Sequence, residues 1–358
     1  MALDSKVPQG KMKKIILPLI LLIASISFYN CESNAINETT NPIIEDPNPI
    51  TNLSFEEAYT FEANLLGGPH IGMTSSTSEN SLYISCRENE SSGNTTEEEI
   101  FKLNLDTNQL TRKNTSPGGF ITKQLTISNN QLVSIGGTEL KTYDLNIVDE
   151  PSSRSYFGID AKNPYFTLSK FGIATDNENT YIIGGYRPDT STKENKKIYK
   201  LNINSEELFE EIIDTPETMI GASAAVVNEK IYVFGGALYE DFQATNKIYI
   251  YPLDNSLNYE ELSMTVAADV TYVHKYGEII LIAGHKGLYA DDKTSFIGTF
   301  DPSTNIFKEI ETNLDSEGGL KAIHQMMVKD DKINILFGSP GNGQNVQSEW
   351  SILTASLK

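Results

Sequence analysis

The sequence predicts an all-β fold, a six-bladed β-propeller with four antiparallel strands in each blade, closed by an N-terminal strand. Three observations predict it. A short apolar phrase recurs six times, no stretch beyond residue 55 keeps a helical period of apolar residues, and the last unit lacks one strand. The copies end at residues 87, 137, 185, 236, 284 and 338, so a unit of about fifty residues repeats. One closed ring of six units makes the repeat region a single domain.

The unit around residues 229–236 shows the order of elements most clearly. It contains a strand of small residues, a tight turn, a mostly apolar strand, a glycine pair, a variable loop and two further strands. Leaving out the loop, these elements are 220–227, 228–229, 230–234, 235–236, 247–252 and 258–262. The other units follow the same order, so we expect each to form one blade.

Glycine and small residues have a physical role in this unit. Glycine adopts positive φ and allows close approach of backbones, which suits the crowded end of the second strand. The first strand contains the run Gly-Ala-Ser-Ala-Ala at 221–225. Small side chains suit the position nearest the axis, where six strands converge. We therefore expect the first strand of each blade innermost and the fourth outermost.

The repeats resemble kelch motifs over roughly residues 64–358. The glycine pair is present at 136–137, 184–185 and 235–236. The segment 299–307 resembles the kelch turn between the third and fourth strands, with Phe307 where the family usually has tryptophan. Trp350 lies instead in the third strand of the last unit. The resemblance implies a propeller whose function depends on its loops.

Ring closure follows from the strands of the last unit. Residues 322–328, 332–337 and 349–355 supply three strands, and a fourth is missing. Residues 56–64 precede the first unit and contain the strand-like run 58–61. We expect this segment to complete the sixth blade, which removes exposed sheet edges.

Residues 1–31 resemble a bacterial export signal, with lysines before an apolar run at 15–26 and Met12 as the expected true start. Cys31 resembles the lipidated cysteine of bacterial lipoproteins, and residues 32–52 read as a flexible tether ahead of a propeller at 53–358. These features predict an outer-membrane lipoprotein of the cell envelope that touches the membrane only through its lipid anchor. Cleavage near 25–27, giving a periplasmic or secreted protein, is the alternative.

Composition narrows the classes of partner. The net charge of −20 disfavours binding to phosphate backbones, so we expect no nucleic-acid partner. Cys31 and Cys86 are the two cysteines, and Cys31 falls in the export signal, so the fold must depend on its core. We expect Cys86 to pack as a small apolar residue at a strand end.

The loops after each second strand and the links into each blade should emerge on one face of the ring. We expect this face to bind a ligand, with aromatic side chains for apolar or sugar faces and arginine for anions. The candidate ligand-binding residues are Arg87, Tyr186, Arg187, Tyr239, Phe242, His285, Tyr289, His70 and His324. The alternative is that these aromatics only cap the hydrophobic layers between blades.

No metal or other cofactor is expected, because the histidines form no short-spaced pair and no His-Glu motif. Sugar-acid epimerases with kelch-like blades offer an enzymatic alternative, in which Arg87 and Arg187 would hold a carboxylate. Loop carboxylates such as Asp241, Asp291 and Asp292 are better explained as solvated charges, so no catalytic residue is assigned.

The sequence thus predicts a cell-envelope binding protein that recognises a glycan or a partner protein through the loop face. Two alternatives stay open: an enzyme acting on a sugar or sugar acid in the central pocket, and a structural repeat in an envelope assembly. Two arginines with a buried carboxylate at the mouth would favour the enzyme, and an exposed aromatic face would favour binding. A flat apolar patch would favour the assembly role.

Overall fold

A computed structural model describes this protein within the compact unit Pro49–Lys358. The described residues are 50–63, 65–87, 97–117, 124–136, 139–145, 152–155, 168–176, 178–186, 194–206, 208–254, 258–286, 294–314, 321–339 and 348–358. The predicted export signal and Cys31 lie outside them. These residues form strands and turns, and none belongs to a helix long and apolar enough to cross a membrane.

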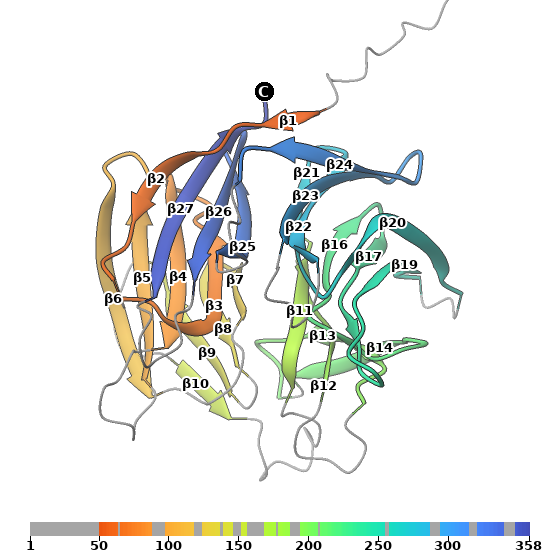
Figure 1. The fold of residues 1–358 in the computed structure, drawn as a ribbon. Helices are drawn as coiled ribbons and strands as arrows, with labels where there is room; N and C mark the ends of the chain where they lie inside the picture. The colour runs from red at the N-terminus through yellow and green to blue at the C-terminus, as the bar shows by residue number, and fades with distance from the viewer. Residues whose placement is uncertain are drawn as a thin grey trace, which may run out of the picture. The chain divides into compact units, whose positions relative to one another are not determined.

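Within the described residues, six antiparallel sheets are arranged as the blades of a propeller (Figure 1), which confirms the predicted fold class. Each blade places its first strand at the inner end of its sheet, as the small residues of this strand predicted. The innermost strands are β3 (Gly67–Ser75), β7 (Gln124–Ser128), β11 (Ser169–Thr175), β16 (Ser223–Val227), β21 (Val270–Tyr276) and β25 (Ala322–Lys329).

Two middle strands follow in each blade and carry most of the apolar core, which lies between neighbouring blades. The second strands are β4 (Ser81–Arg87), β8 (Gln131–Ile135), β12 (Thr180–Tyr186), β17 (Lys230–Phe234), β22 (Ile279–Lys286) and β26 (Lys332–Ser339). The third strands are β5 (Glu97–Asn104), β9 (Glu139–Asp144), β13 (Lys197–Leu201), β19 (Thr245–Pro252), β23 (Thr294–Asp301) and β27 (Glu349–Ser356).

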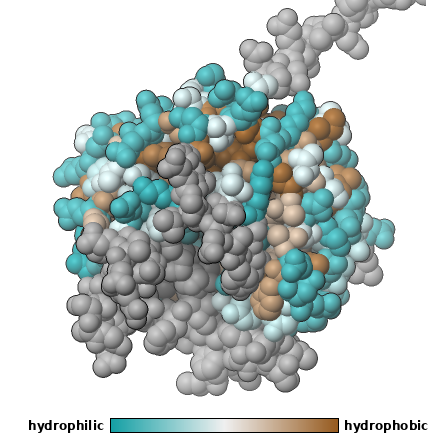
Figure 2. Space-filling model, in the orientation of Figure 1, coloured by the Kyte–Doolittle hydropathy of each residue, from teal (hydrophilic) through white to brown (hydrophobic). Residues whose placement is uncertain are grey.

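The outermost strands are β6 (Gln109–Pro117), β10 (Ser152–Ser155), β14 (Phe209–Asp214), β20 (Glu260–Ala268), β24 (Ile306–Thr312) and β2 (Glu56–Thr60). Exposed glutamates occupy several of them, including Glu210 and Glu211 on β14 and Glu260 and Glu261 on β20. Hydrophilic side chains cover most of the described surface in the view of Figure 2. Charges on an outer strand oppose pairing with another sheet.

The predicted turn at Asn228 and Glu229 is present, with φ of 49° and 58°. The same left-handed pair occurs at Asn129 and Asn130, again between a first and a second strand. Two consecutive residues with positive φ match the twist of the flanking strands and make a two-residue hairpin.

The glycine pairs also adopt the predicted positive φ. Gly184 and Gly185 have φ of 61° and 77°, and Gly235 and Gly236 have φ of 56° and 90°. A Cβ on Gly184 would lie 2.3 Å from the carbonyl oxygen of Met219 in the next blade. Glycine is therefore needed at these positions for two reasons: it adopts the positive φ, and it leaves room for the backbone of the next blade.

Two strands of this unit differ from the expectation: the fourth, expected at 258–262, is β20 at Glu260–Ala268, and the first is divided. Residues 220–227 were expected as one strand, but β16 begins at Ser223 and a separate short strand, β15 (Met219–Ile220), pairs with β18 (Ala237–Leu238). Gly221 divides the two strands with φ of 73°. Its amide instead donates a hydrogen bond of 2.8 Å to the carbonyl of Lys170 in the neighbouring blade.

Ring closure is as predicted: β2 pairs antiparallel with β27 and supplies the missing strand of the sixth blade. An additional strand, β1 (Asn52–Leu53), pairs in parallel with β24 and extends the fifth blade. Asn313 accepts a hydrogen bond from the Phe55 amide at 2.7 Å and donates one to its carbonyl at 3.0 Å. The segment therefore joins two blades.

The remaining packing predictions agree with the structure. Cys86 is buried at the end of β4 in an apolar cluster that also contains Trp350. Phe307 is buried at the start of β24 and packs closely over Gly298.

Candidate functional site

A cavity of about 640 Å³ lies at the centre of the propeller. Consecutive residues of the innermost strands line it, for example 170–175 of β11 and 270–275 of β21. Each innermost strand is the end strand of its sheet, so one of its edges pairs with no other strand of that sheet. This edge faces the cavity and presents both backbone and side-chain groups to it. The small first-strand residues therefore leave a hollow rather than a packed axis.

Hydrogen bonds between neighbouring blades hold the inner strands around this cavity. Thr271 is an example, since its amide donates to the Gly221 carbonyl at 3.0 Å and its hydroxyl oxygen accepts from the Ser223 amide at 2.9 Å. Two glutamine side chains make similar links, Gln124 to the Phe171 carbonyl at 3.0 Å and Gln325 to the Ile71 carbonyl at 2.8 Å. These bonds make the cavity wall a preorganised surface.

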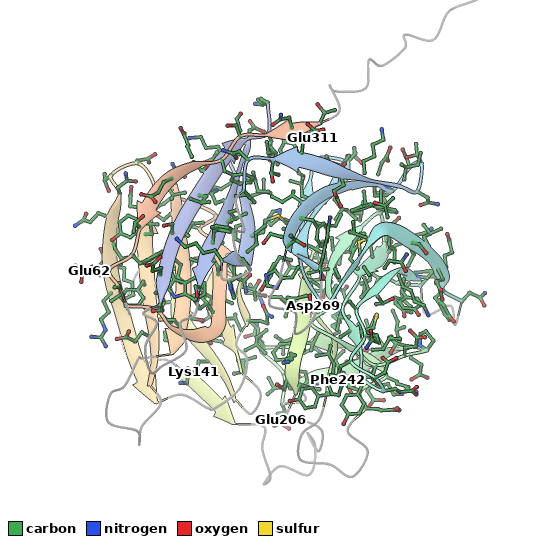
Figure 3. The ribbon with its side chains drawn as sticks, in the orientation of Figure 1. Glu62, Lys141, Glu206, Phe242, Asp269 and Glu311 are labelled. Atoms are coloured by element: carbon green, nitrogen blue, oxygen red, sulfur yellow. The ribbon has the colours of Figure 1, made fainter. Side chains whose placement is uncertain are left out.

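Three of the predicted recognition residues form one aromatic cluster beside the cavity. Tyr186 ends β12 and stacks on Tyr239 with ring centroids 5.9 Å apart. Phe242 lies 5.7 Å from Tyr239, lines the cavity and leaves 41% of its surface exposed. Figure 3 labels Asp269 near the middle of the ring and Phe242 below it in that view. The cluster offers aromatic surface to a molecule that enters the cavity.

Two predicted histidines form a second group, with His285 on β22 of the fifth blade and His324 on β25 of the sixth. The rings of His285 and His324 lie 5.6 Å apart, and Trp350 packs against His324 at 4.7 Å. The ring of His285 meets the Ile323 carbonyl through Nε2. Because a carbonyl only accepts, Nε2 of His285 carries the proton. Both histidines line the cavity.

Tyr272 adjoins this histidine group, with its ring 6.3 Å from that of His285. Burial raises the pKa of the Tyr272 phenol well above its ordinary value, and the nearby charge of Asp269 raises it further. Burial lowers the pKa of His274, which lines the cavity on the same strand. Both groups are therefore neutral near pH 7.

The charges around the cavity differ from those of the whole chain. Two lysines, Lys170 and Lys275, line it, and Asp269 is the single carboxylate among the described lining residues. The whole chain, by contrast, carries a net charge of −20. A cavity so poor in carboxylates suits a neutral or anionic ligand better than a cation.

The other predicted residues have different positions. The backbones of Arg87 and His70 belong to β4 and β3, and their side chains lie outside the described part of the structure, as do Arg187 and Tyr289. Asp241 accepts a hydrogen bond from the Gln243 amide at 3.0 Å within its own loop. Asp291 and Asp292 also lie outside the described residues.

The arginine pair that would favour an enzyme is not present among the described lining side chains, which contain no arginine. Arg112, on the outermost strand of the first blade, instead pairs with Glu99 on the third strand. No group of three or more His, Cys, Asp or Glu side chains in the described residues is arranged to hold a metal ion.

Several cavity residues at or next to the innermost strands were not predicted from the sequence, namely Lys170, Asp269, Tyr272 and His274. The predicted site residues lie mostly in loops, whereas the inner strands present an edge to the cavity and expose residues from both of their faces. The signal available was the position of these residues at or near the first strand of a repeat.

No protein-family model and no curated protein matches this chain. Among solved structures, that of YjhT matches with a TM-score of 0.51 and 13% sequence identity, over 67% of this chain and 83% of that chain. At this identity the likeness shows a shared fold and carries nothing about activity.

Proposed function

We propose that this protein is a cell-envelope binding protein that recognises a glycan through the cavity mouth beside the aromatic cluster of Tyr186, Tyr239 and Phe242. The observation that carries the proposal is the cavity of about 640 Å³ with an exposed aromatic ring at its edge. Ligand sites in proteins are commonly concave, preformed and about 300–1,000 Å³ in volume. Sugar rings pack an apolar face on aromatic side chains and bond their hydroxyls to polar groups such as the inner-strand edges.

Anchoring at the envelope is part of the same proposal. Cys31 would carry the lipid, and the segment between it and the propeller would act as a tether. The tether was predicted to reach residue 52, but Asn52 already belongs to β1, so only the part ahead of this strand would separate the propeller from the membrane. Lipidation is tested by expressing the chain and its Cys31→Ser variant with labelled palmitate. Label in the wild type and none in the variant supports the anchor, and an unlabelled, released wild type supports cleavage near 25–27.

Glycan recognition is tested with a glycan array followed by calorimetric titration of each hit. Tyr239→Ala should weaken binding of a hit at least tenfold, because the variant removes the ring that joins Tyr186 to Phe242. Tyr259→Ala is the matched control, because Tyr259 is 42% exposed on the outer part of the same blade. A glycan that binds both variants as the wild type does would refute this site, and an array without hits would favour a partner protein.

A further inference from the structure

Two residues that line the cavity share an unusual backbone conformation. Ten non-glycine residues of the described structure have positive φ. Eight of them occupy turns that join paired strands: Asn108, Asn129, Asn130, Asn228, Glu229, Asn305, Asp330 and Asp331. The other two are Lys170, at φ of 54° within β11, and Phe242, at φ of 56° in the loop before β19.

The left-handed conformation is unfavourable for both residues. It brings Cβ close to the following carbonyl oxygen, and it is rare for bulky side chains outside turns that need it. Glycine or asparagine would occupy either position with less strain. Residues held in such conformations are found preferentially at functional sites, where the surrounding structure imposes the geometry.

The surroundings fix each of the two residues. The amide of Phe242 donates to the Leu238 carbonyl at 2.8 Å, and the amide of Leu238 donates to the Gln243 carbonyl at 3.0 Å, so the loop closes on itself. The carbonyl of Lys170 accepts the Gly221 amide at 2.8 Å from the next blade. Both residues line the central cavity, although they come from different blades.

Burial in the core does not explain Phe242. Its side chain is 41% exposed, so the ring gains little from packing while its backbone bears the strain. Ile306 is a useful comparison, because it is also exposed, at 50%, but it lies in a β-strand and is not among the residues with positive φ.

We propose that Lys170 and Phe242 are the two ligand-contacting residues that set specificity at the cavity, and that the ligand is a small acid with a flat apolar face. Lys170 supplies the cation for the acidic group and Phe242 supplies the ring for the apolar face. Asp269 is the one carboxylate among the described lining residues, which leaves the cavity suited to an anion. The inference rests on the proposed function, because it assumes that the central cavity is the binding site.

The strain is tested by comparing glycine with alanine. Phe242→Gly and Phe242→Ala both remove the ring, but only glycine relieves the left-handed backbone, so the glycine variant should melt at the higher temperature. At Ile306 the alanine variant should melt at the higher temperature, because glycine there relieves no strain and raises the conformational entropy of the unfolded chain. A Phe242→Ala variant more stable than Phe242→Gly would show that position 242 is unstrained and would overturn the argument.

The ligand class is tested by calorimetric titration of the full chain with galacturonate, 4-hydroxybenzoate and neutral galactose. At least one acid should bind more tightly than galactose, and its affinity should fall as salt is added. Lys170→Gln and Phe242→Gly should each lower the affinity for that acid at least tenfold. Lys332→Gln, at an exposed lysine of β26, should change its affinity less than twofold. Binding of galactose in preference to both acids, or binding of neither acid, would overturn the inference.

A third variant separates this inference from the proposed function. Thr175→Trp places an indole at an exposed position of the cavity wall, away from the Phe242 loop in sequence and strand. If Thr175→Trp weakens binding while Lys170→Gln and Phe242→Gly do not, the cavity remains the site and the specificity inference is wrong. If none of the three variants weakens binding, both proposals are wrong.

Discussion

Thr271 links two blades at the inner ring, and its hydroxyl gives the sharpest test of how the ring is held together. The side chain is 3% exposed. Its hydroxyl oxygen accepts from the Ser223 amide at 2.9 Å, and the hydroxyl donates to the Phe234 carbonyl at 2.8 Å. The substitution Thr271→Val keeps the shape and removes both bonds.

The size of the effect follows from where the two partners lie. The bond to Phe234 is buried, so its carbonyl would lose its partner away from water, at a cost of about 1–3 kcal/mol. Ser223 borders the cavity, where water can replace the lost acceptor. Losing the hydrogen bond from the Ser223 amide would therefore cost at most about 1 kcal/mol. Thr271→Val should therefore lower the free energy of unfolding by about 2–3 kcal/mol.

Thr271→Ser is the control, because serine keeps the hydroxyl and loses one methyl group, at a cost of about 1 kcal/mol. Urea unfolding followed by circular dichroism should rank the proteins as wild type, Thr271→Ser and then Thr271→Val. A valine variant as stable as the serine variant would refute the hydroxyl link, because packing alone would then explain the position.

Three further predictions concern the glycine turns, a hydrogen-bonded carboxylate and the closure. Gly184→Ala should lower the free energy of unfolding by about 2–5 kcal/mol, because a Cβ there would lie 2.3 Å from a backbone carbonyl oxygen. Gly277 also has a positive φ, of 56°, but no atom beyond its two chain neighbours lies within 4 Å of the added Cβ, so Gly277→Ala should lower it by about 1 kcal/mol. Urea unfolding measures both. Burial would raise the pKa of Asp176, but hydrogen bonds from two amides and two side chains outweigh it and hold the pKa low. The stability that Asp176 adds should be present at pH 7 and lost as the pH falls through its folded-state pKa, so the gap to Asp176→Asn should shrink in acid. Asn313→Ala should cost about 1–3 kcal/mol, measured by thermal unfolding, because both hydrogen bonds to Phe55 are lost.

Each of these predictions has an outcome that contradicts it. Equal costs at the two glycines would mean that neighbouring blades do not restrict Gly184. A stability gap at Asp176 that widens in acid would mean that its pKa is raised in the folded state. An Asn313→Ala variant with wild-type stability would mean that the hydrogen bonds between Asn313 and Phe55 add nothing to the stability of the closed ring.

Much of the fold could be predicted because each blade repeats the same local pattern. The turn at Asn228 and Glu229 and the glycine pair after Phe234 define strand ends by backbone conformation, which depends on few residues. The division of the first strand at Gly221 was not predicted, because it depends on a hydrogen bond to Lys170 in another blade. The parallel pairing of β1 likewise depends on contacts distant in sequence.

The site was predicted less completely. Tyr186, Tyr239 and Phe242 were named because loop aromatics are visible in sequence, and the structure brings their rings together. Lys170 and Asp269 were not named, because a position at or near the first strand of a repeat does not by itself show which residues line a cavity. The positive φ of Lys170 and Phe242 is a property of the folded backbone and has no signal in residue type.

The central claim is that the ligand enters the cavity beside Phe242. Hydrogen–deuterium exchange of the full chain, with and without the tightest hit of the glycan array, measures this most directly. We expect slower exchange at residues 237–245 and along β11, β16 and β21, whose edges line the cavity. Slower exchange confined to the outer strands β14, β20 and β24, with the cavity strands unchanged, would contradict it.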